Sequence, residues 1–302
     1  MKAICVLVLL ARVASAESPA DIAARRNEDG KDLMAAQKLK DAGGKFRAAA
    51  SLDPQAKYYF NLCLSLYGRN MFGAALEACK MAATLHPTPQ LQTKIEKYVK
   101  RIITDATNQH MPLEPVADTA EGSDDAGIDL MFAGEYALAV AQFRNAAALE
   151  PKARYGFNLC TALYQAGRFA QANTACRWAL ANKPATELRA KAENTIKKIS
   201  EDATAQHISL MSTPEPGSAA DFAMAADQDG EELRDHDLDA ARLKFREAVA
   251  RDPQAGYFYN LCAVDAALGK PDEAADACNA VLTHKPSAAL KAKANAWLAA
   301  AR

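Results

Sequence analysis

The sequence contains one unit three times over. The stretches FRAAASLDPQAKYYFNLC, FRNAAALEPKARYGFNLC and FREAVARDPQAGYFYNLC correspond, and residues 29–106, 124–203 and 227–302 align over most of their length. Cys160 follows Cys63 by 97 residues, and Cys262 follows Cys160 by 102. Self-similarity at a long period indicates a repeat architecture, in which the core is distributed along an array. We therefore expect an array of three similar copies.

Each copy is predicted to consist of five helices. Half of the residues are hydrophobic by count and alanine is abundant, which favours helices. Pro151 and Pro184 close two helices, and Gly134 and Gly167 mark short turns. In the middle copy the predicted helices are 124–133, 136–149, 152–165, 169–182 and 186–206. The first four form two antiparallel hairpins. The predicted fold class is all-α, with helical-hairpin repeats arranged as an α–α superhelix or as three tandem modules.

These hairpins resemble tetratricopeptide repeats. The first hairpin of the middle copy carries Ala139-x3-Phe143 followed by Pro151, which fits that family's pattern. The same positions hold Ala42, Phe46 and Pro54 in the first copy, and Ala241, Phe245 and Pro253 in the third. The second hairpins carry the family's leucine at 62, 159 and 261 and its closing proline at 87, 184 and 286. The family's initial tryptophan is absent throughout. The resemblance covers most of the chain.

Two family positions in each second hairpin are occupied by cysteines, which stand where the family has a glycine and a phenylalanine. In the first hairpins these positions keep the usual residues, for example Gly127 and Phe143. Antiparallel helices bring the two positions level, and a disulfide needs Cα atoms about 4.4–6.8 Å apart. We therefore predict the disulfides Cys63–Cys79, Cys160–Cys176 and Cys262–Cys278. Each closes a loop of about 15 residues, worth ~3 kcal/mol in the chain-entropy model. Six buried free thiols are the alternative.

The N-terminal stretch MKAICVLVLLARVASAES is interpreted as a secretory signal that ends at Ala16. It has one lysine, a short apolar run and the small residues Ala14, Ser15 and Ala16. A buried first helix is the alternative. Its removal leaves six cysteines, and an even set in an exported chain favours disulfides. No apolar run approaches the roughly 20 residues that a membrane span needs. We expect a soluble protein, exported to the periplasm or the extracellular space after cleavage near Ala16.

The predicted domain organisation follows the three copies. It comprises a signal peptide at 1–16, the first tetratricopeptide-like unit at 17–107, a linker at 108–121, the second unit at 122–206, a linker at 207–219 and the third unit at 220–302. Both linkers contain proline and are short, so they are expected to be semi-extended. The linkers and the long fifth helix favour three semi-independent modules, although stacking into one superhelix is left open.

No catalytic, cofactor-binding or metal-binding residue is predicted. The sequence lacks a nucleophile elbow, a Walker loop, a dinucleotide-binding glycine pattern and a His-Glu-x-x-His motif. The cysteine pairs lack the close spacing of zinc ligands. Asp124, Asp125, Asp227 and Asp229 are interpreted as residues at helix starts, where carboxylates cap the helix. A formal net charge of −1 gives no reason to expect nucleic acid as a partner.

The resemblance implies a concave groove lined by the first helix of each hairpin. The side chains predicted to project into it are Lys57, Phe60, Asn61, Tyr67, Arg154, Phe157, Asn158, Tyr164, Tyr259 and Asn260. In peptide-binding members an asparagine at the place of Asn158 bonds the peptide backbone. The alternative is that these residues are family consensus without a ligand. The lysine and asparagine of the family's carboxylate clamp are not matched, because Asp124 and Ile128 stand near their positions.

The sequence thus favours a non-enzymatic protein-interaction scaffold that binds a partner peptide or domain in the groove. One alternative is a structural or assembly accessory of envelope machinery that acts by self-association. The other is a non-catalytic or cryptic enzyme subunit. Neither the partner nor the oligomeric state follows from the sequence.

Overall fold

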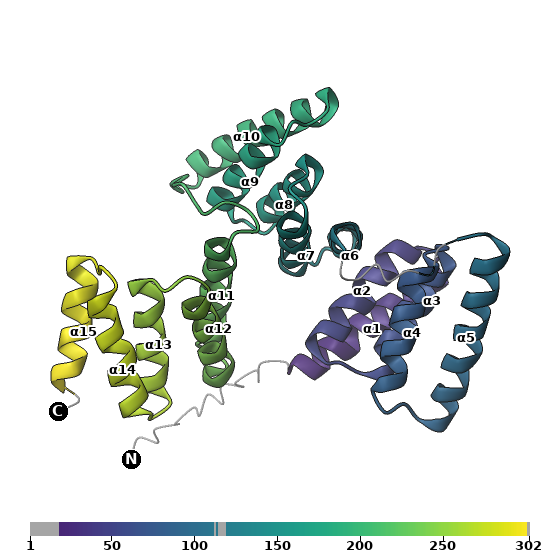
Figure 1. Ribbon diagram of the computed structural model, residues 1–302, viewed down its shortest axis with the longest axis horizontal. Coiled ribbons are helices and arrows are strands. Elements are labelled where there is room, and N and C mark those ends of the chain that lie inside the picture. The colour runs from purple at the N-terminus through teal and green to yellow at the C-terminus, as the bar shows by residue number, and fades with distance from the viewer. Residues whose placement is uncertain (1–17, 112, 114–118, 301–302) are drawn as a thin grey trace, which may run out of the picture. The chain divides into compact units, whose positions relative to one another are not determined.

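The computed structural model describes residues 18–111, 113 and 119–300, and in this part the chain is all-α (Figure 1). The predicted signal sequence lies outside the described residues. The first copy contains α1 (Pro19–Ala35), α2 (Leu39–Leu52), α3 (Ala56–Gly68), α4 (Phe72–Thr84) and α5 (Pro89–Asn108). The second contains α6 (Ala120–Phe132), α7 (Tyr136–Leu149), α8 (Ala153–Gln165), α9 (Phe169–Ala181) and α10 (Thr186–Ala205). The third contains α11 (Ala219–Leu233), α12 (Leu238–Arg251), α13 (Ala255–Ala267), α14 (Pro271–Thr283) and α15 (Ala288–Ala300). The all-α hairpin fold is confirmed.

The first hairpin of each copy is closed by a glycine that faces a phenylalanine ring. A Cβ atom at Gly127 would lie 2.5 Å from Cε1 of Phe143, closer than packed atoms allow. The corresponding distances are 2.6 Å from Gly30 to Phe46 and 2.7 Å from Gly230 to Phe245. All three rings are at most 1% exposed. Only glycine lets the helices approach this closely, so the ring fills the gap between them.

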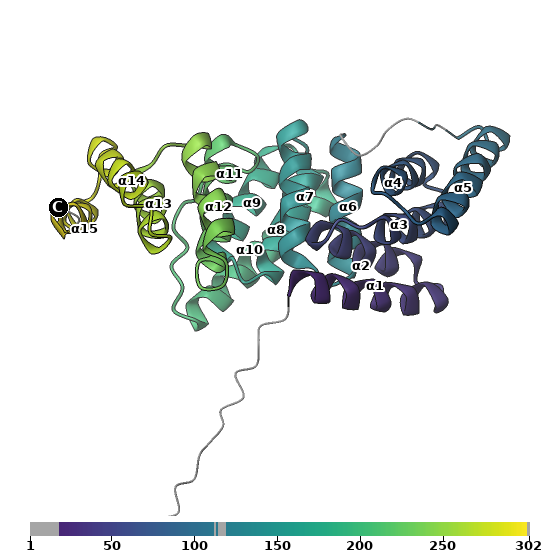
Figure 2. The same cartoon turned by 90° about the horizontal axis from the view of Figure 1, so that it is seen from below.

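The second hairpin of each copy is closed by a disulfide at the equivalent place. The bonds Cys63–Cys79, Cys160–Cys176 and Cys262–Cys278 join α3 to α4, α8 to α9 and α13 to α14, and their Cα–Cα distances are 5.2, 5.1 and 5.3 Å. All six cysteines are at most 1% exposed. The predicted pairing is confirmed. In both Figure 1 and Figure 2, α13 and α14 lie side by side as the antiparallel arms of such a hairpin.

Turns between the arms of the hairpins use a left-handed residue at the same place. Asn70, Gly167 and Gly269 have φ angles of 60°, 74° and 67°, which glycine adopts freely and asparagine tolerates. Helix starts are fixed by side-chain caps at several positions. The hydroxyls of Ser18, Thr88 and Ser218 each accept a bond from the backbone N–H three residues later.

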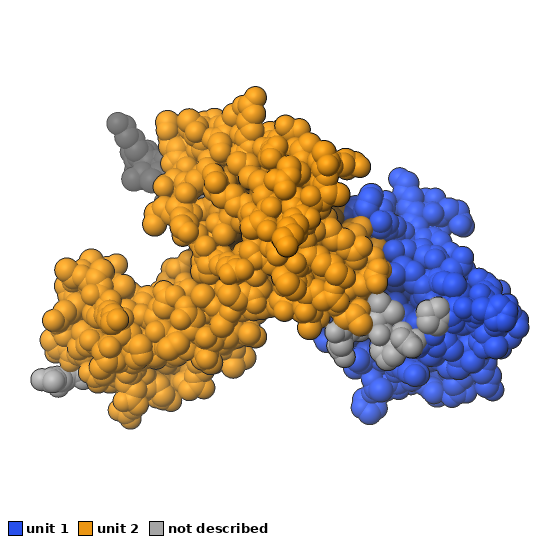
Figure 3. Space-filling model, turned by 45° about the horizontal axis from the view of Figure 1, so that its top comes forward, with its two compact units in different colours: residues 1–115, 132–135 blue, residues 116–131, 136–302 orange. Residues whose placement is uncertain are grey.

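The chain divides into two compact units, one of residues 1–115 and 132–135 and the other of residues 116–131 and 136–302 (Figure 3). The second compact unit holds most of the second copy together with the third. The preference for three semi-independent modules stays a prediction, and one buried ion pair joins the second copy to the third. Arg144 Nε on α7 donates to Asp221 Oδ2 on α11 at 3.0 Å, and both side chains are almost fully buried.

The linker between the second and third copies also packs closely. Gly217, with φ of 75°, lies so near α7 that a Cβ atom there would be 2.7 Å from the backbone nitrogen of Ala148. Trp178 Nε1 donates to Glu215 at 2.8 Å. These contacts hold the linker on the surface of the second copy. Among the described residues, no helix is long and apolar enough to cross a membrane.

Candidate partner-binding groove

Alternate helices of a copy lie next to one another and form one layer. In the first copy α3 contacts both α1 and α5, and in the third α13 contacts both α11 and α15. In the second copy α8 contacts α10. The predicted groove residues all lie on the middle helix of such a layer, which is α3, α8 or α13. This layer is therefore the candidate groove.

The three predicted asparagines bind the first helix of their own copy. Asn61 Nδ2 donates to Asn27 Oδ1 at 2.8 Å. Asn158 Nδ2 donates to Asp124 Oδ1 at 2.7 Å, and Asn260 Nδ2 donates to Asp227 Oδ1 at 2.9 Å. One role of these asparagines is thus to tie the two hairpins of a copy together. The amides of Asn61 and Asn158 have a second N–H and a carbonyl oxygen for further bonds, whereas Asn260 Nδ2 also donates to Glu231 Oε1 at 3.4 Å.

Asp124 and Asp227 lie inside α6 and α11, so their interpretation as residues at helix starts is wrong. The helices begin earlier, at Ala120 and Ala219. Asp124 is only 2% exposed. Burial raises the pKa of both carboxyls, although the bond from the asparagine acts in the opposite direction.

The predicted tyrosines Tyr67 and Tyr164 hold the fifth helix. The Tyr67 hydroxyl donates to Asp105 Oδ2 on α5, and the Tyr164 hydroxyl donates to Asp202 Oδ2 on α10. The pKa of Tyr67 is raised by burial and by its bond to Asp105. The bond to Asp202, followed by burial, raises the pKa of Tyr164. Both tyrosines therefore stabilise the layer as well as lining it.

The predicted aromatic residues differ in how far they are covered. Phe60 is only 7% exposed, and its ring meets that of Tyr98 edge-on at 5.7 Å. Phe157 and Tyr259 are half-buried, and Lys293 Nζ lies 5.6 Å from the centre of the Tyr259 ring. Phe60 thus belongs to the core of the first copy, while the other two rings keep part of their surface accessible.

The predicted basic residues are exposed. Lys57 Nζ lies 4.9 Å from the centre of the Tyr58 ring. Arg154 Nε is 3.5 Å from Asp124 Oδ2, and its Nη2 donates to the Tyr155 hydroxyl at 3.3 Å. Because these two cations stand on the layer with solvent around them, they are the predicted residues best placed to meet a partner.

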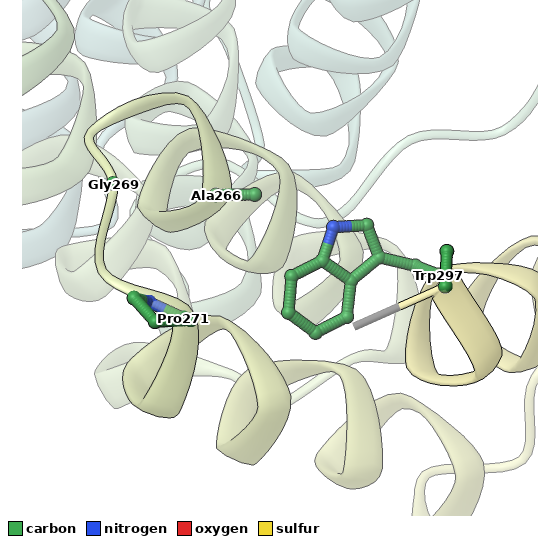
Figure 4. Close-up of a pocket in the computed structure, with 5 residues that line it drawn as sticks. Ala266, Gly269, Pro271 and Trp297 are labelled. Atoms are coloured by element: carbon green, nitrogen blue, oxygen red, sulfur yellow. The ribbon is translucent and has the colours of Figure 1, made fainter. Parts of the chain in front are cut away.

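The third copy contains a cavity of about 460 Å³ that the sequence analysis missed. It is lined by Ala266, Gly269, Pro271, Trp297 and Ala300, and Figure 4 shows the Trp297 indole pointing toward the side of Ala266 and Pro271. We call it the Trp297 pocket. An alignment of the three copies indicates this pocket, because Ala266 stands where the other two copies have Tyr67 and Tyr164.

Within residues 18–111, 113 and 119–300, which the structure describes, no group of three or more histidine, cysteine, aspartate or glutamate side chains is arranged to hold a metal ion. The exposed charges and half-buried rings of the layer suit non-covalent contacts with another protein surface.

Comparison with known proteins gives structural matches only. No family profile matches the sequence, and no curated protein matches it. Among solved structures, the TPR2AB domain of yeast Sti1 in complex with pHSP90 is 14% identical, with a TM-score of 0.25, 92% of this chain covered and 82% of that one. The APC/C hetero-tetramer Cut9–Hcn1 is 15% identical, with a TM-score of 0.26, 92% of this chain covered and 42% of that one. The fold assignment rests on this chain's own paired helices.

Proposed function

We propose that this protein is a non-enzymatic interaction scaffold that binds a partner peptide or domain on the groove layer of its copies. The observation that carries the proposal is that one helix of the layer holds both residues that fix it in the fold and an exposed charged residue. Asn158 and Tyr164 fix α8 between α6 and α10, while Arg154 on the same helix stays exposed. A rigid layer with exposed charged groups loses little conformational entropy when it binds a partner.

We also propose that the chain is exported. Three buried disulfides suit an oxidising compartment, and the N-terminal sequence has the pattern of a cleaved signal. The intact mass of the protein recovered from its native host tests this step. A mass that lacks residues 1–16 and six hydrogens supports export with oxidation. A full-length chain with six alkylatable thiols would contradict it.

The groove is tested by cross-linked capture from the native host with single variants. Asn158→Ala and Tyr164→Ala are poor tools, because both remove bonds within the fold. The variants Lys57→Ala and Arg154→Ala remove exposed groove charges instead. Arg154→Ala also loses contacts with Asp124 and Tyr155, so circular dichroism checks that it stays folded. The matched controls are Lys80→Ala on α4 and Arg177→Ala on α9, which are exposed cations on helices outside the layer.

We expect one partner to be lost with at least one groove variant and retained with both controls. A partner retained by all four variants would exclude the groove. Sedimentation equilibrium addresses the alternative, because concentration-dependent association of the protein alone would favour an assembly role by self-association.

A further inference from the structure

The Trp297 pocket exists because the third copy lacks two rings that the other copies have. Cys262 follows Cys63 by 199 residues, and at the same offset Ala266 replaces Tyr67 and Pro271 replaces Phe72. In the first copy the Tyr67 ring lies 6.1 Å from the Phe72 ring. In the second copy Tyr164 and Phe169 repeat this pair at 5.9 Å. The space that two aromatic rings fill elsewhere is therefore open in the third copy.

The residue that faces those rings in the first copy has an aromatic equivalent in the third copy. Trp297 stands at the position of Tyr98, whose ring meets that of Tyr67 edge-on at 5.9 Å. Trp297 is half-buried, and Pro271 is exposed, whereas Phe72 and Phe169 are 2% and 7% exposed. The pocket is open to solvent on one side, and its volume of about 460 Å³ is within the range of ligand sites. An inserted aromatic ring would regain the contacts that the tyrosine makes in the other copies.

The charges beside the pocket indicate which residues would flank the aromatic ring of a ligand. The helix that carries Trp297, α15, contains Lys291 and Lys293 and no carboxylate. Lys293 precedes Trp297 by one turn and therefore lies on the same face of the helix. The carboxylates Asp227 and Glu231 lie on the other side of α13, on α11. Asp272 and Glu273 follow Pro271 at the start of α14. A ligand acid is thus attracted to the α15 side and repelled from the α11 and α14 sides.

We propose that the Trp297 pocket binds an aromatic side chain of a protein partner, with acidic residues next to that side chain meeting Lys293. This proposal rests on the proposed scaffold function and gives the chemistry of one segment of the partner. The ring takes the place that Tyr67 and Tyr164 fill in the other copies. The acid supplies the charge that α15 lacks.

The test uses the full chain with Trp178→Phe, because Trp297 is then the sole tryptophan. The probe is the acetylated, amidated peptide Asp-Glu-Phe-Glu-Asp, whose phenylalanine does not obscure tryptophan fluorescence. We expect a saturable change in Trp297 emission, and calorimetry gives the affinity independently. A peptide with alanine in place of phenylalanine should bind at least about tenfold more weakly, as should one with lysines in place of the acids.

The decisive variant is Ala266→Tyr with Pro271→Phe, which restores the two rings of the other copies. We expect it to remain folded by circular dichroism and to bind the peptide at least about tenfold more weakly. Ala266→Leu fills the pocket by a smaller change and replaces the double variant if that one misfolds. Equal binding by the filled protein, or no saturable binding by the open one, would overturn the proposal.

The two proposals fail separately. Loss of the pocket proposal leaves host capture through Lys57 and Arg154 unaffected, because those residues lie in the other two copies. If the open protein self-associates and the filled variant does not, the pocket belongs to another molecule of this chain, and the proposed occupant is wrong.

Discussion

In each copy the two hairpins close the equivalent contact between their helices by different means. In the first hairpin of the second copy, Gly127 lets α6 and α7 approach and the Phe143 ring fills the gap. In the second hairpin, the Cys160–Cys176 bond joins α8 to α9 at a Cα–Cα distance of 5.1 Å. The first solution depends on packing in the folded state. The second also restricts the unfolded chain, so the two hairpins should respond differently to substitution and to reductant.

The largest expected effect is the loss of the ring in a first hairpin. Phe143→Ala removes a side chain that is 1% exposed and leaves a cavity beside Gly127. Such substitutions cost about 3–5 kcal/mol. Urea unfolding followed by circular dichroism measures the change. A cost below about 1 kcal/mol would mean that the hairpin collapses around the gap and that the glycine–ring contact is not what closes it.

The next effect is the loss of a disulfide in a second hairpin. Cys160→Ala with Cys176→Ala keeps small side chains in place and should cost about 3 kcal/mol, because the unfolded chain regains the freedom of the loop. The difference between wild type and this variant should vanish when both are unfolded in reductant. A difference in stability that persists in reductant would mean that packing of the sulfur atoms dominates. Both hairpins would then depend on packing in the folded state.

An exchange of the two solutions tests their equivalence with a smaller expected effect. Gly127→Cys with Phe143→Cys places two cysteines sixteen residues apart in a first hairpin. The stability lost with the ring and the stability gained from the disulfide are of similar size. The free energy of unfolding should therefore change by no more than about 2 kcal/mol. Intact mass before and after alkylation shows whether the bond forms. Two free thiols in the folded protein would show that the two hairpins do not share one geometry.

The smallest expected effect concerns the bond that joins the two hairpins. In the first copy the side-chain amide of Asn61 donates to Asn27, while in the second copy that of Asn158 donates to Asp124. Burial raises the pKa of Asp124, so the folded protein binds the proton more tightly than the unfolded chain does. Its contribution to stability is therefore present below the unfolded pKa and is lost as pH rises through the folded pKa.

Asp124→Asn makes the second copy like the first and removes this dependence. We expect a modest gain in stability at pH 7 that disappears toward pH 3, measured by urea unfolding across that range. The control is Asp272→Asn, a substitution of an exposed carboxylate in the first turn of α14. A loss of stability at pH 7 in Asp124→Asn would show that the nearby Arg154 outweighs burial.

The elements that depend on local sequence could be predicted. Four of the five predicted helices of the middle copy agree with the structure to within one residue at each end, because proline and glycine punctuate them. The disulfide pairing followed from the hairpin turn between Cys160 and Cys176. The exception is α6, which begins at Ala120, where the Thr119 hydroxyl accepts a bond from the Gly122 N–H. Asp124 lies inside this helix and accepts a bond from Asn158.

The site was harder to predict, because its bonds join residues far apart in sequence. Asn158 was placed in a groove by resemblance, and its bond to Asp124 depends on the rotation of two helices that the pattern does not specify. The Trp297 pocket was missed because it arises from side chains that are absent. Only a comparison of Ala266 and Pro271 with their equivalents in the other copies indicates it.

The buried pair of Arg144 and Asp221 has a consequence for multivalent ligands. Because Arg144 lies on α7 and Asp221 on α11, this ion pair joins the second copy to the third. A partner with two short segments spaced to match would bind the second segment at a high effective concentration once the first is engaged. Two weak contacts would then give avid binding, and the linker length in the partner would set its selectivity.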